Sequence, residues 1–199
     1  MFGRPSLRRL AAAAVIVVVA MTAVVITLER TSLLRASPEL PQIGGHFDLS
    51  TADGSRVSER TFRGKWLLVY FGYTSCPDVC PTTLSSMAQA LQALGPLADK
   101  IQPLFITLDP ARDKPEIVGE YANDFDPRFV GLTGNVREIA AAAGDFHVYY
   151  VARHLGNNEY VIDHSSFIYV LDPGGKFVRL LTGDLPGHQL ADELRKLLG

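Results

Sequence analysis

Continuous apolar runs and amphipathic segments alternate along most of the chain. Residues 65–72 are a continuous apolar run rich in β-forming residues, which is typical of a central strand buried on both faces, and residues 101–108 predict a second buried strand. Between them, apolar side chains recur at helical spacing over residues 82–94, and Gly95 and Pro96 end the predicted helix. This strand–helix–strand order predicts an α/β domain.

Shorter elements follow in the second half of the chain. We expect helices at 116–123, 135–143 and 189–198, a short strand at 129–132, strand-like runs at 146–152, 166–171 and 176–181, and a small hairpin made by 47–50 and 56–58. Asp172-Pro-Gly-Gly175 joins the last two strand-like runs and is a strong turn signal between antiparallel strands. A thioredoxin-like α/β domain has this order of elements: strand–helix–strand first, then a hairpin and a terminal helix. In that architecture the active cysteines follow the first core strand, at the start of the next helix.

A separate hydrophobic block lies near the N-terminus. Residues 10–28 are 19 residues without a charge, close to the roughly 20 that cross a bilayer as a helix. Arg4, Arg8 and Arg9 precede it, so the positive-inside rule predicts a cytoplasmic segment at 1–9 and export of the rest. A cleaved signal peptide is the alternative, but its apolar region usually runs about 7–15 residues before a small-residue cleavage site. We therefore predict a retained transmembrane anchor.

Behind the predicted anchor, composition indicates a tether and one domain. Residues 29–45 contain Pro, Ser and Gly, and residues 46–199 suit a single globular domain. From Thr31 onward 15 Lys and Arg stand against 20 Asp and Glu, a net charge of −5. Without a basic run or an arginine-rich stripe, we expect no nucleic-acid partner. The predicted location is a bacterial inner membrane, with a single span and the C-terminal domain in the periplasm.

The chain has two cysteines, Cys76 and Cys80, directly after the first predicted core strand. Pro81 is a common first residue of a helix and disfavours the helical region for the residue before it, so we expect the helix to begin at Pro81 with Cys80 as its N-cap. Both sulfurs would then lie at the positive end of the helix dipole, and at least one should have a depressed pKa. A purely structural disulfide is disfavoured, because a bridge across three residues closes almost no loop.

Two thiolates alone serve redox chemistry or metal binding equally well. A third candidate is His164, which stands just before an apolar run and beside Asp163. Asp163 either orients the imidazole or caps the loop, and a loop histidine beside a carboxylate is often simply solvated. Met87 falls on the apolar stripe of its helix, so we expect it in the core. The acidic segment at 109–113 is by default a solvated loop, with a partner-docking surface as the alternative.

Four motifs in order resemble the Sco/SenC family. They are FGYTSCPDVCPTTL, LDPARDKPE, GLTG and YVIDHSSFIYVLDPGGKF. The resemblance covers most of residues 47–199 and includes the N-terminal anchor. It implies a membrane-anchored, thioredoxin-fold copper protein that assists cytochrome c oxidase assembly. The family's copper ligands map onto Cys76, Cys80 and His164.

The chemistry of these residues agrees with a copper site. Soft thiolates favour Cu(I), and one imidazole completes a three-coordinate site, while Cu(II) could use the same ligands plus an oxygen. Zinc is the competitor, because the spacing of the two cysteines is also zinc spacing. A structural zinc site usually has four protein ligands, and the sequence contains no second cysteine pair. A catalytic zinc with three ligands stays open.

The resemblance implies a copper-delivery protein rather than an enzyme. It would pass copper to cytochrome c oxidase subunit II by ligand exchange, with another copper chaperone or a thiol reductant as further partners. A Cys76–Cys80 disulfide would remove two of three ligands and so gate the site. The alternative is a thiol–disulfide reductase that keeps the oxidase's metal-site cysteines reduced, which needs the redox-active pair but not His164. The three-residue spacing argues against it, since oxidoreductases of this fold use CxxC, and a peroxidase is a weaker third hypothesis.

Overall fold

The computed structural model describes residues 19–25, 43–157 and 159–199. These residues fall into two units, of which the second spans Ile43–Gly199. In the first unit, residues 19–25 are helical. Most of the predicted anchor at 10–28 lies outside the described residues, and no helix among those described is long and apolar enough to cross a membrane. The anchor, its cytoplasmic leader and the tether stay predictions.

A five-stranded mixed sheet forms the centre of the domain. Its strand order is β5-β4-β3-β8-β9. The strands are β3 (Trp66–Gly72), β4 (Ile101–Thr107), β5 (Val130–Leu132), β8 (Phe167–Leu171) and β9 (Phe177–Thr182). The first three run parallel to one another, whereas β8 is antiparallel to both β3 and β9. The thioredoxin-like α/β fold is therefore confirmed, with β3 as its central strand.

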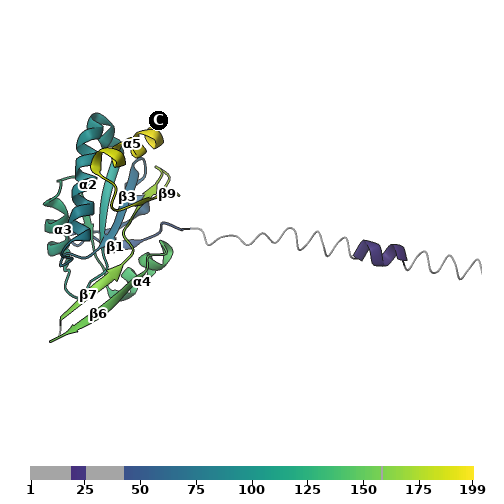
Figure 1. Cartoon of the computed structure of the whole chain (residues 1–199), viewed down its shortest axis with the longest axis horizontal. Coiled ribbons are helices and arrows are strands. Elements are labelled where there is room, and N and C mark those ends of the chain that lie inside the picture. Colours follow the sequence, from purple (N-terminus) through teal and green to yellow (C-terminus); the bar gives the residue numbers. More distant parts are fainter. Residues whose placement is uncertain (1–18, 26–42, 158) are drawn as a thin grey trace, which may run out of the picture. The chain divides into compact units, whose positions relative to one another are not determined.

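The apolar run of β3 is buried because both faces of the sheet are covered. Residues 67–72 all lie in the core. On one side α2 (Val79–Leu94) and α5 (Gly187–Leu198) pack against each other (Figure 1). Met87 of α2 is fully buried, as its place on the apolar stripe predicts. Elsewhere in the core, Phe71 of β3 contacts the ring of Phe146 at a centroid distance of 5.1 Å.

The remaining elements surround this centre. They are β1 (Asp48–Ser50), β2 (Arg56–Ser58), the 3-10 helices η1 (Glu59–Phe62) and η2 (Gly95–Lys100), and the helices α3 (Pro115–Asn123) and α4 (Val136–Asp145). β1 and β2 pair antiparallel, so the predicted first hairpin is confirmed. Asn135 accepts hydrogen bonds from the backbone N–H groups of Arg137 and Glu138, and this capping box sets the start of α4.

A second hairpin stands apart from the main sheet. β6 (Tyr150–Gly156) and β7 (Glu159–His164) pair only with each other among the described strands. The prediction of a strand over 146–152 was wrong at its start, because Phe146 caps α4 and is fully buried there. β7 was not predicted, since polar residues occupy both of its ends. Figure 1 shows this hairpin as a ribbon that extends away from the sheet.

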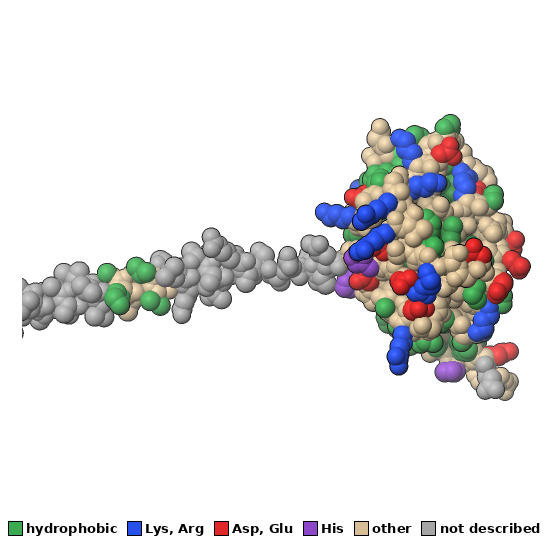
Figure 2. All heavy atoms as spheres, turned by 180° about the vertical axis from the view of Figure 1, so that it is seen from behind, with side chains coloured by type: hydrophobic (Ala, Val, Ile, Leu, Met, Phe, Trp, Pro, Cys, Tyr) green, Lys and Arg blue, Asp and Glu red, His purple; other side chains and the backbone are tan. Residues whose placement is uncertain are grey.

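The surface of the domain carries charges of both signs. On the face shown in Figure 2, Lys and Arg side chains lie among Asp and Glu side chains, with apolar side chains exposed between them. Some surface charges of the domain are paired across elements, as in the contact between Arg179 of β9 and Glu193 of α5 at 2.5 Å. Such exposed pairs contribute little to stability.

Candidate metal centre

Cys76 and Cys80 lie on the segment that joins β3 to α2. The helix begins at Val79, so the prediction of a start at Pro81 was wrong, and Cys80 is in the first turn rather than at the N-cap. Pro81 fits there because N–H groups in the first turn have no partner within the helix, so proline removes no hydrogen bond. The free N–H of Cys80 points instead at the Cys76 Sγ, 3.4 Å away. The helix N-terminus thus stabilises a thiolate at Cys76, as its dipole predicts.

The two sulfurs differ in exposure. Cys80 is completely buried, whereas Cys76 is only partly buried, and neither is in a disulfide. Gly72 makes room for the buried sulfur, because a Cβ at that position would lie 2.7 Å from the Cys80 Sγ. The glycine at the end of β3 is therefore a requirement of the site.

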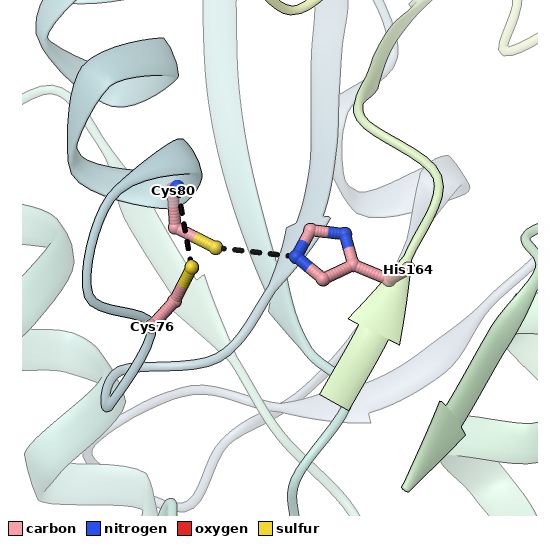
Figure 3. A group of neighbouring side chains, drawn as sticks. All are labelled: Cys76, Cys80 and His164. Carbon is pink, nitrogen blue, oxygen red and sulfur yellow. Dashed lines mark hydrogen bonds between the residues drawn. The ribbon is translucent and has the colours of Figure 1, made fainter. Parts of the chain in front are cut away.

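His164 enters the same site from the end of β7 (Figure 3). Its Nε2 lies 3.4 Å from the Cys80 Sγ, and its Nδ1 lies 3.0 Å from the backbone carbonyl oxygen of Ser165. A carbonyl oxygen only accepts, so Nδ1 carries the proton and donates to it, which leaves the Nε2 lone pair directed at the sulfurs. The rings of Tyr70 and Tyr73 meet the imidazole edge-on at centroid distances of 6.3 and 6.0 Å.

The three side chains together have the dimensions of a metal site. Their ligand atoms all lie within 4.8 Å of one another, and no other such group of three occurs in the part of the chain that the structure describes. Metal–sulfur and metal–nitrogen bonds of about 2.0–2.3 Å place two ligands of one ion at most about 4.6 Å apart. Two thiolates and one imidazole form a donor set that suits Cu(I) or zinc.

The two thiols have opposite pKa shifts. A hydrogen bond from the Cys80 side chain, with smaller contributions from the backbone N–H groups of Cys80 and Asp78, outweighs burial and lowers the pKa of Cys76 to about 4. The Cys76 sulfur and burial in turn raise the pKa of Cys80. At neutral pH the free protein therefore holds a thiolate at Cys76 and a thiol at Cys80, in keeping with the expected acidic cysteine.

Alkylation of the reduced protein by iodoacetamide should report this acidic thiol. We expect the rate at Cys76 to fall to half its plateau near pH 4, because thiolate rather than thiol is the nucleophile. Cys80→Ala removes the hydrogen bond that lowers the pKa of Cys76 most, so the alkylation midpoint should move to higher pH. A midpoint near the ordinary value of about 8.5 in the unmodified chain would contradict the assignment.

Asp163 does not orient the imidazole. Its carboxylate accepts a hydrogen bond from Arg153 across the hairpin at 3.0 Å, and both side chains are exposed. The Ser165 carbonyl supplies the contact to the ring instead, which sequence reasoning missed because a backbone group leaves no residue signature. The other four histidines are exposed and lie outside the cluster of three: His46, His147, His154 and His188.

The acidic segment after β4 is not a solvated loop. Asp109 and Asp113 are 3% and 1% exposed, so both the default interpretation and an acidic docking surface at these carboxylates are wrong. Asp113 accepts hydrogen bonds from the backbone N–H and the hydroxyl of Thr74, at 2.9 and 2.6 Å. No local pattern marks this burial, because Thr74 lies 39 residues from Asp113 in the sequence. Asp113 therefore holds the loop that leads to Cys76.

Fold and site together define the class of this protein: a thioredoxin-like domain with two cysteines and a histidine within metal-bonding distance. The SCO1/SenC family model matches residues 35–199, and the chain belongs to that family.

Known relatives extend over the same domain. Protein sco1 of Schizosaccharomyces pombe is 41% identical over 155 residues, which are 76% of this chain and 59% of that protein. The crystal structure of Arabidopsis thaliana ScoI with copper bound is similar with a TM-score of 0.73 and 37% identity, over 77% of this chain and 96% of that one. Yeast Sco1 with copper bound gives a TM-score of 0.72 and 36% identity, over 78% and 88%. The match thus spans less than two thirds of the fission-yeast protein.

Proposed function

We propose that this chain binds copper through Cys76, Cys80 and His164 and serves the assembly of cytochrome c oxidase. The observation that carries the proposal is the cluster itself, with two sulfurs and one imidazole nitrogen within 4.8 Å. The donor set is soft and three-membered, which suits Cu(I). The relatives with copper bound, which share this fold at 36–37% identity, support the choice of copper over zinc.

Each residue has a distinct part in holding and releasing the metal as cargo. Cys76 is already a thiolate and partly exposed, so it is the first ligand that an incoming ion or partner meets. Cys80 is buried and must lose its proton when metal binds. His164 presents Nε2 because the Ser165 carbonyl holds Nδ1. In this proposal, subunit II of the oxidase takes the metal by ligand exchange, in the periplasm of a bacterium whose inner membrane holds the N-terminal anchor.

Thiol oxidation gates this site in our proposal. The cysteines are free and their sulfurs lie within 4.8 Å of each other, so a disulfide would require only a small movement and would remove two of three ligands. The acidic Cys76 also favours the second candidate function, a thiol–disulfide reductase acting on the oxidase's copper-site cysteines, because a thiolate attacks disulfides at neutral pH.

Anaerobic titration of the reduced chain with Cu(I), against a competing chelator, tests the proposal. We expect one ion per chain and an affinity that rises about tenfold per pH unit between pH 7 and 8, because binding displaces one proton from Cys80. The sign follows from the raised pKa of Cys80, which keeps that thiol protonated in the free protein over this range. Absence of binding would refute the proposal, and an affinity independent of pH would refute the protonation state.

A further inference from the structure

One loop contacts both segments that carry the metal centre: the segment before Cys76 and the strand β7 that ends at His164. The loop follows β4 and contains Asp109, Arg112 and Asp113, none of which belongs to the cluster of three ligands. The Asp113 carboxylate accepts hydrogen bonds from the backbone N–H and the hydroxyl of Thr74, which is two residues before Cys76. It accepts a third from the hydroxyl of Thr107 at 2.6 Å. The cysteine half of the site is thereby held to β4.

Arg112 contacts β7, the strand that carries His164. Its guanidinium lies 3.8 Å from the ring centre of Tyr160 on β7, and its Nη1 donates to the Tyr160 backbone carbonyl at 3.1 Å. The Nε of Arg112 pairs with the buried carboxylate of Asp109, which also accepts a hydrogen bond from the Tyr160 hydroxyl at 2.8 Å. Arg112, Asp109 and Tyr160 thus form a closed network, which we name the hairpin clamp.

The clamp matters because the hairpin has no strand partner in the main sheet. Within the described strands, β6 and β7 pair only with each other, and most of β6 is exposed. Ile162 is the one buried residue of β7, and the clamp adds a polar attachment two residues earlier, at Tyr160. Tyr160 precedes His164 by four residues on the same strand, so a displacement of Tyr160 is transmitted along β7 to the imidazole.

We propose that Arg112 is a positioning residue of the metal centre, which fixes β7 through Tyr160 so that His164 reaches the cysteine sulfurs. This inference rests on the proposed function for the identity of the metal. Lysine cannot replace arginine here, because an ammonium lacks the planar fork that stacks on the ring and bonds two acceptors at once. Outer residues that orient a metal ligand typically change affinity by about 10- to 100-fold when mutated.

The chain offers a matched control for Arg112→Lys. Arg128 pairs with the buried carboxylate of Asp126 at 2.7 Å, and the exposed fractions of the two arginine side chains are 35% and 34%. Arg128 stands beside β5, and in the described part of the chain its side chain bonds to Asp126 rather than to the hairpin or the proposed ligands. Arg128→Lys therefore makes the same substitution at an equivalent ion pair and an equivalent exposure, away from the centre.

Two measurements test the proposal. In the metal-free, reduced chain, hydrogen exchange should show a loss of protection over residues 150–164 in Arg112→Lys and none in Arg128→Lys. Cu(I) affinity should fall by about 10- to 100-fold in Arg112→Lys, and this loss should vanish when His164 is already alanine, because the effect passes through the imidazole. Tyr160→Phe, which keeps the ring and loses the hydroxyl, should change both readouts in the same direction and serves if Arg112→Lys folds poorly.

The outcomes separate this inference from the proposed function. Unchanged hairpin protection, or an equal loss of affinity with and without His164, overturns the role of Arg112. Failure of the unmodified chain to bind Cu(I) refutes the proposed function instead, and the exchange measurement in the metal-free chain still decides whether Arg112 places the hairpin.

Discussion

Replacement of Cys80 by serine is expected to lower the affinity for Cu(I) by about 10³-fold. Four-ligand zinc sites bind with about 10–16 kcal/mol, so one ligand contributes roughly 2.5–4 kcal/mol, or about 10²- to 10³-fold. A thiolate should stand at the upper end of this range, because Cu(I) prefers soft sulfur over a hydroxyl oxygen. Chelator competition under anaerobic conditions measures the loss directly.

The serine variant separates ligand loss from damage to the fold. Cys80 is completely buried beneath Gly72, and the smaller oxygen of serine fits in the same space. Thr82→Ser, on the same turn of α2 and exposed, is the matched control and should bind as the unmodified chain does. A Cys80→Ser protein that melts normally and still binds Cu(I) tightly would show that Cys80 is no ligand.

Replacement of His164 by alanine is the second large change. We expect the Cu(I) affinity to fall by about 10²-fold, the lower end of the same range, because both thiolates remain. Disulfide exchange with a small-molecule disulfide should survive, since Cys76 and Cys80 keep their dithiol chemistry. Parallel measurement of the two activities therefore distinguishes copper binding from thiol reduction.

His188→Ala is the control for this variant, because His188 is exposed on α5 and lies outside the cluster of three. It should match the unmodified chain in both assays. Copper affinity that does not change in His164→Ala would exclude the imidazole as a ligand. Loss of both activities together would instead point to a displaced cysteine loop, which hydrogen exchange over residues 73–80 would detect.

The central part of the fold was predictable because its signals are local. The apolar run of β3 and the helical spacing of α2 depend on neighbouring residues, and both elements occur where expected apart from the first residues of α2. The hairpin was harder to predict. β7 has a single buried residue, Ile162, so burial leaves little alternation in its sequence, and the strand is defined by pairing with β6.

The three residues of the proposed site were predictable from motifs, but the contacts that support them were not. Cys76 and Cys80 stand in one segment of the sequence. His164 was assigned through the family resemblance, because the residues around it do not by themselves predict a metal ligand. Burial of Asp113 depends on Thr74, a partner 39 residues away in sequence. A pairing over that separation has no local pattern, so an acidic loop of this kind looks solvated until the fold is known.

The position of His164 late in the chain also sets the order in which the centre can form during synthesis. The central strand β3 obtains its second neighbour only from β8, which follows His164, and 83 residues separate Cys80 from that histidine. A growing polypeptide therefore contains the dithiol long before the imidazole exists, and contacts between distant segments form late because their loops are long. Up to that point a nascent chain can offer metal two sulfurs only. Capture by all three proposed ligands therefore requires a chain that extends past His164, and fragments truncated before His164 should bind metal as simple dithiol peptides.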